Sequence, residues 1–460
     1  MTAPANASDR VLATLNEDGS RRWIRPKPSA GKWLIRRRWV AYALIALFLA
    51  IPHLRMNGKP WMLLDLPHRQ FTFFGTTFLP TDTLLLMLLF VSALIGIFLL
   101  TALFGRVWCG WACPQTVWME FIFRPIERLV EGGFNASRVL DRERKHVAPR
   151  RLLKYAIYAV LSLTLGNTFL AYFVGTDTLW VWVLSSPSDH LTGFLVMAVT
   201  AAAVFLDFTW FREQTCLVAC PYGRWQSALL DRQSLIVAYD ATRGEPRGHG
   251  AGARTGLGDC IACNACVTTC PTGIDIREGL QMECIHCTQC ADACDEIMVK
   301  VGKPEGLIRY TSTDALAGNA PRMLRARTVL YPLAFTLFFG GFLFALATRS
   351  PADVTLLGGQ GAPFSQDADG NVVNQVRFRV ANRTSEDRAY TITYLDEDGA
   401  KLIAPENPIR VPTGGTTTAT VFVVQPAARF ANGERLVRFR LSDGESFTRE
   451  FSWRLLGPQD

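Results

Sequence analysis

Residues 260–271 read CIACNACVTTCP, and residues 284–295 read CIHCTQCADACD. Both stretches space four cysteines as C-x2-C-x2-C-x3-C, and the first ends in Pro271 where the second has Asp295. Three closely spaced cysteines suit three irons of a cubane, while the fourth cysteine binds the cluster of the other stretch. The doubled spacing therefore predicts two 4Fe-4S clusters in one small domain of the bacterial ferredoxin type.

The exchange of the fourth cysteine assigns the eight ligands. One cluster is expected on Cys260, Cys263, Cys266 and Cys294, and the other on Cys284, Cys287, Cys290 and Cys270. Pro271 should bend the chain away after the crossing cysteine, whereas Asp295 leaves the geometry of the second turn open. A zinc ribbon is the alternative, but zinc sites rarely use this doubled spacing. His286, inside the second stretch, is expected either to tune the cluster or to pack beside it.

Two further cysteine pairs share a different spacing. CGWACP at Cys109–Pro114 and CLVACP at Cys216–Pro221 are both C-x3-C-P. On a helix, residues i and i+4 lie about 5–6 Å apart on one face, and the proline should end or kink that turn. Converging thiolates select Cu(I), zinc or an iron–sulfur cluster, and four buried cysteines without a ligand are the alternative. The candidate ligands are Cys109, Cys113, Cys216 and Cys220. The spacing does not decide between copper and a further cluster.

Five apolar stretches predict a membrane domain. They are residues 39–54, 83–104, 155–176, 191–211 and 328–348. A helix needs about 20 residues to cross roughly 30 Å of hydrocarbon, and only the first stretch is marginal, with a buried core helix as its alternative. The mean hydropathy of +0.15 also argues against an ordinary soluble enzyme. We therefore expect a five-helix transmembrane bundle with an uncleaved first anchor.

The distribution of Lys and Arg predicts the orientation. Residues 1–38, 105–154 and 212–327 are rich in basic residues, whereas residues 55–82 and 177–190 have few or none. The positive-inside rule then places the N-terminus on the cytoplasmic side of the membrane, which we expect to be a bacterial inner membrane. All twelve cysteines fall in the cytoplasmic segments, where a reducing environment suits thiolates that bind metal. The net charge of +8 reflects this topology rather than nucleic-acid binding.

The last part of the chain, residues 349–460, is predicted to form a periplasmic β-sandwich. Its alternating apolar and polar segments, separated by Gly, Pro, Asn and Asp, predict short strands. These segments are residues 376–380, 390–395, 418–424, 436–441 and 447–454. The Cys…Trp…Cys pattern of antibody domains is absent from this part of the sequence.

The predicted domains follow one another along the chain. A basic arm that binds anionic lipid (1–38) precedes four helices with the C-x3-C-P motifs (39–240), a Gly-rich linker (241–258), the ferredoxin-type domain (259–310), a fifth helix (328–348) and the sandwich (349–460). Residues 244–258 lack a phosphate-binding G-x-x-x-x-G-K-[ST] motif, which favours a flexible linker. Scattered residues of the outer loops either form an external copper or quinone site or pack near the ends of the helices. They are His53, Met56, Met62, His68 and His190.

These motifs resemble the CcoG/FixG (also RdxA) family of cytochrome c oxidase accessory proteins. The resemblance covers nearly the whole chain, including CGWACPQTVWMEFIFRPIE, CLVACPYGRWQSALLD, the doubled ferredoxin run and the β-rich tail. It implies an immunoglobulin-like tail and a membrane-bound cupric reductase that supports copper delivery to cbb3-type cytochrome c oxidase. It also implies that Cys109, Cys113, Cys216 and Cys220 bind and reduce copper. The implied partners are the oxidase assembly factors and a copper-exporting P-type ATPase.

Two other functions use the same motifs. A quinol-linked electron-transfer subunit would use every motif without copper. An assembly scaffold or copper chaperone would use its clusters to sense redox state without turnover. Potentials of such clusters span a wide range, so the sequence reveals neither the direction of electron flow nor the cytoplasmic electron donor.

Overall fold

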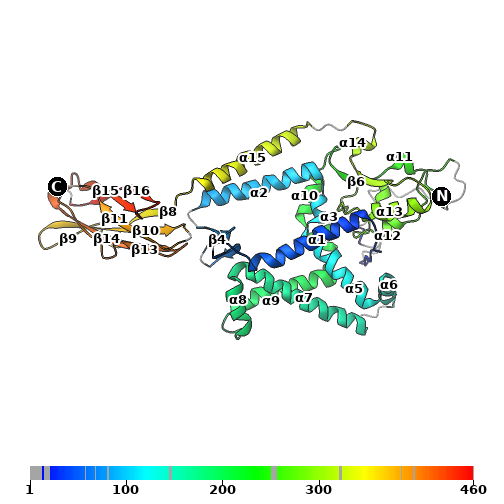
Figure 1. The fold of residues 1–460 in the computed structure, drawn as a ribbon, viewed down its shortest axis with the longest axis horizontal. Helices are drawn as coiled ribbons and strands as arrows, with labels where there is room; N and C mark the ends of the chain where they lie inside the picture. Colours follow the sequence, from blue (N-terminus) through cyan, green and yellow to red (C-terminus); the bar gives the residue numbers. More distant parts are fainter. Residues whose placement is uncertain are drawn as a thin grey trace. The chain divides into compact units, whose positions relative to one another are not determined.

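The chain forms two compact units, of which the first is mainly helical and the second mainly β (Figure 1). The computed structural model describes residues 13–14, 21–56, 58–67, 69–79, 82–143, 148–249, 256–320, 324–384, 386–396 and 399–458. The helical unit comprises residues 1–54, 60–64 and 88–340, and the β unit comprises residues 55–59, 65–87 and 341–460.

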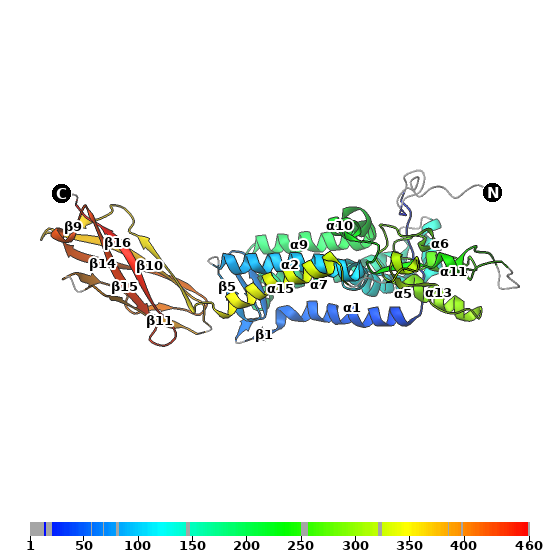
Figure 2. The ribbon, with the colours of Figure 1, turned by 90° about the horizontal axis from the view of Figure 1, so that it is seen from above.

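Four helices in the described part of the chain are long and apolar enough to cross a membrane. They are α2 (Thr83–Phe104), α7 (Pro149–Val174), α9 (Leu191–Leu206) with its continuation in the π-helix η4 (Asp207–Phe211), and α15 (Ala326–Ala347). Figure 2 shows the long helices of the helical unit sharing one general direction. These four helices correspond to the second to fifth predicted spans.

The prediction of a five-helix transmembrane bundle is wrong in its first helix. The stretch 39–54 forms only the second part of α1 (Lys32–Ala50), and the chain then tightens into the 3-10 turn η2 (Ile51–His53). Three consecutive arginines, Arg36, Arg37 and Arg38, occupy the first turns of α1. The apolar remainder is too short to cross about 30 Å of hydrocarbon, so four helices qualify instead of five.

Helix α1 nevertheless packs within the helical unit. Tyr172 of α7 donates a hydrogen bond of 2.6 Å to the Phe48 carbonyl near the C-terminal end of α1. Near the other end, Arg37 is fully buried, and its Nε donates to the Gly110 carbonyl at 2.9 Å. Helix α1 therefore reaches from the first C-x3-C-P motif to the C-terminal end of α7.

Short helices join the long ones around the C-x3-C-P motifs. They are α3 (Val107–Trp111), α4 (Pro114–Trp118), the π-helix η3 (Met119–Phe123), α5 (Arg124–Glu131), α6 (Phe134–Arg142), α8 (Thr176–Leu184), the π-helix η5 (Thr215–Ala219) and α10 (Pro221–Leu229). Phe123 stacks on Phe208 with 4.0 Å between the ring centroids. This contact packs η3 against η4, so the two motif-bearing segments share one core.

The ferredoxin-type region lies within the helical unit. Strand β6 (Ile236–Tyr239) pairs antiparallel with β7 (Ile308–Thr311), and both flank the cysteine runs. Its other elements are α11 (Ala241–Gly244), α12 (Ala265–Thr268), the 3-10 turn η6 (Ile276–Glu278), α13 (Gln289–Lys300) and α14 (Thr313–Leu316).

Part of the predicted basic arm packs against this region. The Lys27 amide donates to the Thr268 carbonyl at 2.9 Å, and Ser29 Oγ donates to the Gln289 carbonyl at 3.2 Å. Residues 1–12 and 15–20 of the arm lie outside the described residues, as do residues 250–255 of the predicted linker.

The β unit is a two-sheet sandwich, as the alternating segments predict. One sheet has the order β12-β14-β10-β8, with β9 pairing β10, and the other has the order β13-β11-β15-β16. Alternate residues of β10 face a buried core, among them Val376 and Phe378, because successive strand residues point to opposite faces. The strands are β8 (Ala352–Gly358), β9 (Ser365–Gln366), β10 (Asn371–Asn382), β11 (Arg388–Tyr394), β12 (Lys401–Ile403), β13 (Ile409–Val411), β14 (Thr416–Pro426), β15 (Glu434–Ser442) and β16 (Thr448–Leu456).

Short strands precede α2 in the first predicted outer loop. They are β1 (Arg55–Met56), β2 (Lys59–Pro60), β3 (Met62–Asp65), β4 (Gln70–Phe73) and β5 (Thr76–Phe78). Within the β unit, the buried carboxylate of Asp82 forms ion pairs with Arg349 and Arg383. This pairing ties the start of α2 to the sandwich.

Candidate functional site

The two ferredoxin-type runs adopt the same backbone conformation. In each run, the residues on either side of the second cysteine have positive φ: 52° and 58° at Ala262 and Asn264, and 54° and 58° at His286 and Thr288. This conformation is unfavourable for residues with a side chain, especially β-branched threonine. Alternation of left- and right-handed residues turns successive N–H groups into a concavity that suits anions, including iron–sulfur clusters. The backbone of both runs therefore fits such a group.

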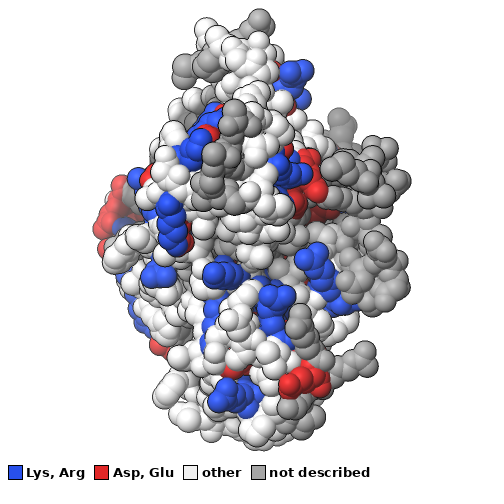
Figure 3. Space-filling model, turned by 90° about the vertical axis from the view of Figure 1, so that its right-hand side faces the viewer, with Lys and Arg blue, Asp and Glu red and all other residues white. Residues whose placement is uncertain are grey.

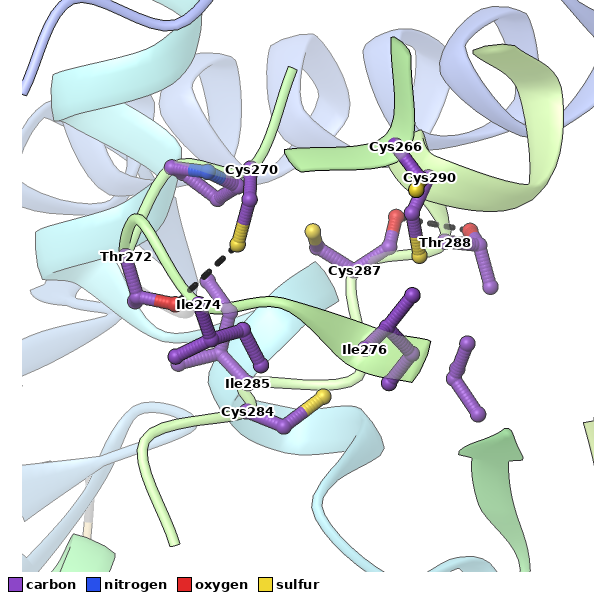
Figure 4. Close-up of a pocket in the computed structure, with 12 residues that line it drawn as sticks. Cys266, Cys270, Thr272, Ile274, Ile276, Cys284, Ile285, Cys287, Thr288 and Cys290 are labelled. Carbon is purple, nitrogen blue, oxygen red and sulfur yellow. Dashed lines mark hydrogen bonds between the residues drawn. The ribbon is translucent and has the colours of Figure 1, made fainter. Parts of the chain in front are cut away.

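Each predicted ligand set surrounds one cavity. Cys270, Cys284, Cys287 and Cys290 line the first cavity, and Cys260, Cys263, Cys266 and Cys294 line the second. Figure 4 shows the sulfurs of the first set around a shared space bordered by Ile274, Ile276 and Ile285. Cys266 lines both cavities, so the two sites are neighbours. The structure thus brings together the residues of each predicted set.

Burial makes these cavities unfavourable for bare thiolates. It raises the pKa of the Cys287 thiol to about 11 and the pKa of the Cys284 thiol to about 12. Cys263, by contrast, is exposed. A buried thiolate needs a cation to offset the loss of hydration, and iron supplies that charge when it displaces the protons. The donor set therefore fits two clusters held by thiolates.

The proline difference between the runs changes the helix that follows each one. After Cys270, Pro271 follows the single-turn helix α12. The equivalent position of the second run holds Asp295 instead of proline, and α13 continues through it to Lys300. The Asp295 carboxylate accepts a hydrogen bond of 2.8 Å from the Gly306 amide. The turn that the sequence left open is therefore a continued helix.

Each C-x3-C-P pair lies across a break between two helices. Cys109 is in α3 and Cys216 in η5, whereas Cys113 and Cys220 have extended backbones and cap α4 and α10. A proline disfavours helical conformation in the residue before it and is well placed at the first helical position. The expectation that the proline ends the turn is confirmed, and for this reason the two cysteines of a pair do not share one face of one helix.

The four C-x3-C-P thiols nevertheless converge. Burial, together with the charge of the neighbouring C-x3-C-P thiolates, raises the pKa of Cys109 to about 11 and also raises that of Cys216. Cys109 Sγ donates to Gln226 Oε1 at 2.9 Å. Among the described residues, no group of three or more His, Cys, Asp or Glu side chains is arranged to hold a single metal ion. The thiols are thus neighbours without a preformed single-ion geometry.

The first C-x3-C-P motif contacts the second ferredoxin-type run directly. Cys109, Ile285 and Cys287 belong to one buried cluster. At Gly110 a Cβ atom would lie 2.5 Å from the Ile285 carbonyl oxygen and 2.9 Å from Cys287 Cα, so only glycine allows this approach. The Arg106 amide donates to His286 Nδ1 at 3.2 Å. The two cysteine regions are therefore packed against each other.

His286 is a neighbour held in this contact. Burial and the charge of Arg106 lower the pKa of the imidazole to about 3. Tyr310 Oη donates to the His286 carbonyl at 2.8 Å, and Trp111 Nε1 donates to the same hydroxyl at 2.9 Å. His286 thus joins the motif around Cys109 to the second run as a neutral side chain.

Sequence reasoning missed a buried ion network around the C-x3-C-P motifs. Glu127 accepts two hydrogen bonds from Arg212, at 2.8 and 3.1 Å, and pairs with Arg25 and Lys154. Burial would raise the pKa of Glu127, but Arg212 and Arg25 together hold it well below its usual range. The sequence did hold one signal, because Glu120, Arg124 and Glu127 recur at helical spacing after Cys113.

The network also reaches the ferredoxin-type runs. Arg124 pairs with Glu120 and Glu213, and its guanidinium donates to the Pro271 carbonyl at 3.3 Å. Gln289 Nε2 donates to Glu120 Oε2 at 3.3 Å. Buried charges therefore connect both halves of the candidate site.

The outer-loop residues are not gathered into a His-based metal site in the described part of the chain. His190 stacks on Trp182 with 4.6 Å between the ring centroids, which favours a packing role. His53 follows α1 in η2, whereas Met56 and Met62 lie in β1 and β3. His68 lies outside the described residues.

Comparison with known families supports the domain types. A 4Fe-4S dicluster domain matches residues 211–313, and a 4Fe-4S binding domain matches residues 85–132. A family described as an Ig-like fold at the C-terminus of FixG matches residues 342–458. The iron–sulfur character of the chain and the immunoglobulin-like tail are thereby confirmed.

Related proteins cover most of the chain. Protein RdxA of Cereibacter sphaeroides is 36% identical over 83% of this chain and 83% of its own length. Protein RdxB of the same organism is 35% identical over 92% of each chain. The nitrogen fixation protein FixG of Rhizobium meliloti is 31% identical over 96% of this chain and 93% of its own. The chain therefore belongs to the CcoG/FixG/RdxA family.

Proposed function

We propose that this protein reduces Cu(II) to Cu(I) at Cys109, Cys113, Cys216 and Cys220 and thereby supports copper delivery to a cbb3-type cytochrome c oxidase. The family and its 4Fe-4S domains indicate the general function, which is redox electron transfer. The observation that carries the finer proposal is the contact of Cys109 with Ile285 and Cys287. A thiol site that touches a proposed cluster ligand is placed to receive electrons.

The proposed cluster ligands are the two sets of four cysteines around the two cavities. When bound, such clusters transfer one electron at a time, at potentials set by net charge, hydrogen bonds and solvent exposure. Cys287 borders both its own cavity and the C-x3-C-P region. Its side chain and that of Ile285 are buried in one cluster with Cys109.

The C-x3-C-P thiols favour the reduced form of copper. Soft thiolates select Cu(I) over harder ions, so one electron and one bound Cu(II) give a product that this site stabilises. Burial raises the pKa of Cys109, so copper must displace the thiol proton as it binds. In the copper-free protein, the Cys109 thiol donates a hydrogen bond to Gln226 Oε1.

The proposed topology keeps both cysteine regions on one side of the membrane. Two candidate spans, α7 and α9, separate residues 105–148 from residues 212–325. Two crossings return the chain to the same side, whether or not α1 enters the membrane. The Lys and Arg distribution favours the cytoplasm for that side, and an impermeant thiol reagent applied to oriented vesicles tests the assignment.

Replacement of all four C-x3-C-P cysteines by serine tests the proposal. Cu(II) reduction by the dithionite-reduced protein should be lost, while iron content and the low-temperature electron spin resonance of the two proposed clusters stay unchanged. A matched variant, Cys284→Ser, should instead lose one cluster. Unchanged Cu(II) reduction in the four-serine protein would falsify the copper assignment.

A second function has one specific observation in its favour. The 4Fe-4S binding domain family matches residues 85–132, which include Cys109 and Cys113. In this alternative the four C-x3-C-P thiols hold a further cluster, and the chain is a quinol-linked electron-transfer subunit without copper. Metal analysis of anaerobically purified protein separates the two, because the alternative requires iron beyond two clusters and no retained copper.

A further inference from the structure

A basic cavity opens beside Cys270, one of the proposed cluster ligands. It has a volume of about 580 Å³ and is open to solvent. Its lining comes from residues 21–25, from α6 and from the segment 267–273. Cys270 also lines the enclosed cavity of its own ligand set. A single side chain thus borders both the open cavity and a proposed cluster site.

The rim of this cavity carries uncompensated positive charge. Arg22 and Arg138 are exposed, and neither forms an ion pair with a described residue. The acidic side chain in the lining, Asp141, is already held by Arg25, with 3.0 Å between Nε and Oδ2, and by Arg151. Figure 3 shows Lys and Arg side chains, interspersed with Asp and Glu, over the face that it draws. An anion that enters the cavity can therefore pair with the guanidinium groups of Arg22 and Arg138.

The same cavity also offers aromatic and aliphatic surface. Trp23 is 38% exposed, with the Arg21 guanidinium 4.1 Å from its ring centroid, and Phe134, Val267 and the buried Ile24 complete the apolar part of the lining. Planar rings pack well against such side chains, whereas guanidinium groups match the geometry of phosphate oxygens. The lining thus suits a molecule that combines a planar ring with a phosphate.

We propose that this cavity binds a flavin nucleotide, with the phosphate at Arg22 and Arg138 and the ring toward Trp23 and Cys270. The proposal rests on the electron-transfer function proposed above and identifies the chemistry of its donor. A fully reduced flavin would give up two electrons, one at a time, and release two protons to solvent as it becomes oxidised flavin, and the cysteine sets around the two cavities would hold the one-electron acceptors. A reduced nicotinamide transfers a hydride, which does not match a pair of one-electron acceptors.

Flavin binding by the full-length protein in detergent tests the site. FMN, FAD and riboflavin share one ring system, but riboflavin lacks the phosphate, so quenching of flavin fluorescence isolates the phosphate contribution. FMN, FAD or both should bind at least about tenfold more tightly than riboflavin, since charged hydrogen bonds contribute about that much. The comparison of FMN with FAD shows whether a monophosphate or a diphosphate ester is preferred.

Charge reversal at the rim provides the decisive variants. The double variant Arg22→Glu with Arg138→Glu should remove the preference for the phosphate. Lys300→Glu, an exposed reversal on α13 outside the cavity lining, should keep it. Visible absorption of the clusters checks that each variant folds. Equal affinity for all three flavins, or a preference that survives the double reversal, overturns the proposal.

A kinetic measurement adds a second readout. Cluster reduction by reduced FMN should be faster than by reduced riboflavin, and the double reversal should abolish that difference. Failure of the copper proposal is distinguishable, because Cu(II) reduction by unmodified protein that was reduced with dithionite and then freed of it does not depend on this cavity. A protein that fails to reduce Cu(II) but keeps the phosphate preference contradicts only the copper proposal.

Discussion

The ferredoxin-type runs and the C-x3-C-P pairs both gather cysteines, but different parts of the structure hold them. In each run, a few consecutive residues with repeated left-handed backbone positions bring three sulfurs to one cavity. The C-x3-C-P pairs lie about a hundred residues apart and meet through the packing of η3 on η4 and through buried ion pairs. A local motif thus shapes the first region, and tertiary structure shapes the second.

This difference predicts which substitutions damage which region. Residues remote from the runs should leave the proposed clusters intact, since each run carries its own backbone geometry. Residues of the buried network should affect the C-x3-C-P thiols, because Arg212 and Glu213 shortly precede Cys216, whereas Glu120 and Glu127 shortly follow Cys113. Three substitutions test the comparison, in order of expected effect.

Glu127→Gln should have the largest effect. It leaves Arg212, Arg25 and Lys154 without their shared carboxylate, and breaking a buried pair in this way costs about 3–5 kcal/mol. Denaturant unfolding in detergent measures the loss, and copper retention should fall while both proposed clusters stay. Glu296→Gln is the matched control, since its exposed pair with Lys300 contributes about 1 kcal/mol or less.

The same carboxylate predicts a pH dependence. In the folded chain, the cations around Glu127 hold its pKa well below the ordinary value of 4.5 despite burial. A carboxyl group whose pKa is lower in the folded than in the unfolded chain stabilises the fold at pH values above its unfolded pKa. This contribution is lost as the pH falls through the folded pKa. The unmodified protein should therefore lose more stability than Glu127→Gln on acidification below pH 4.5. Equal losses would contradict the assignment.

Asp295→Pro tests the difference between the two runs. It gives the second run the proline of the first, but inside α13 the ring removes a helical hydrogen bond and costs about 3 kcal/mol. The variant also loses the acceptor of the Gly306 amide. The spin resonance of the cluster proposed at Cys294 should change. Asp295→Ala removes only the carboxylate and should leave the signal intact, so an equal effect would contradict the role of the continued helix.

Gly110→Ala should have the smallest effect on stability and a specific effect on function. The added methyl group meets the Ile285 carbonyl and the Cys287 backbone, and such overpacking costs about 1–3 kcal/mol. Both proposed clusters should remain, while Cu(II) reduction slows because the two regions move apart. Gly340→Ala in α15 is the control, since a Cβ there meets no atom within 4 Å. Unchanged reduction by Gly110→Ala would show that this contact is not needed.

Local chemistry explains what the sequence predicts well. The doubled spacing identifies the two cysteine sets, alternation identifies strands such as β10 and β14, and length with apolarity identifies α2, α7, α9 and α15. These features depend on near neighbours along the chain, so they are visible without tertiary contacts.

Tertiary contacts explain what the sequence does not predict. The charges of Arg36, Arg37 and Arg38 limit the apolar length of α1, yet Arg37 is buried in the tertiary structure, where its Nε donates to the Gly110 carbonyl. The ion network was missed because its members come from segments far apart in the chain. The helix break inside each C-x3-C-P pair follows from its proline, whereas the position of one pair relative to the other depends on tertiary packing.

The exposure of Cys263 has a consequence for handling the protein in air. Seven of the eight ferredoxin-type cysteines are buried or partly buried, but this one is reached by solvent. Dissolved oxygen therefore has a shorter route to the iron proposed behind Cys263 than to any iron behind Cys284 or Cys287. In an aerated sample the two centres should decay one after the other, and the brown colour should fade in two stages.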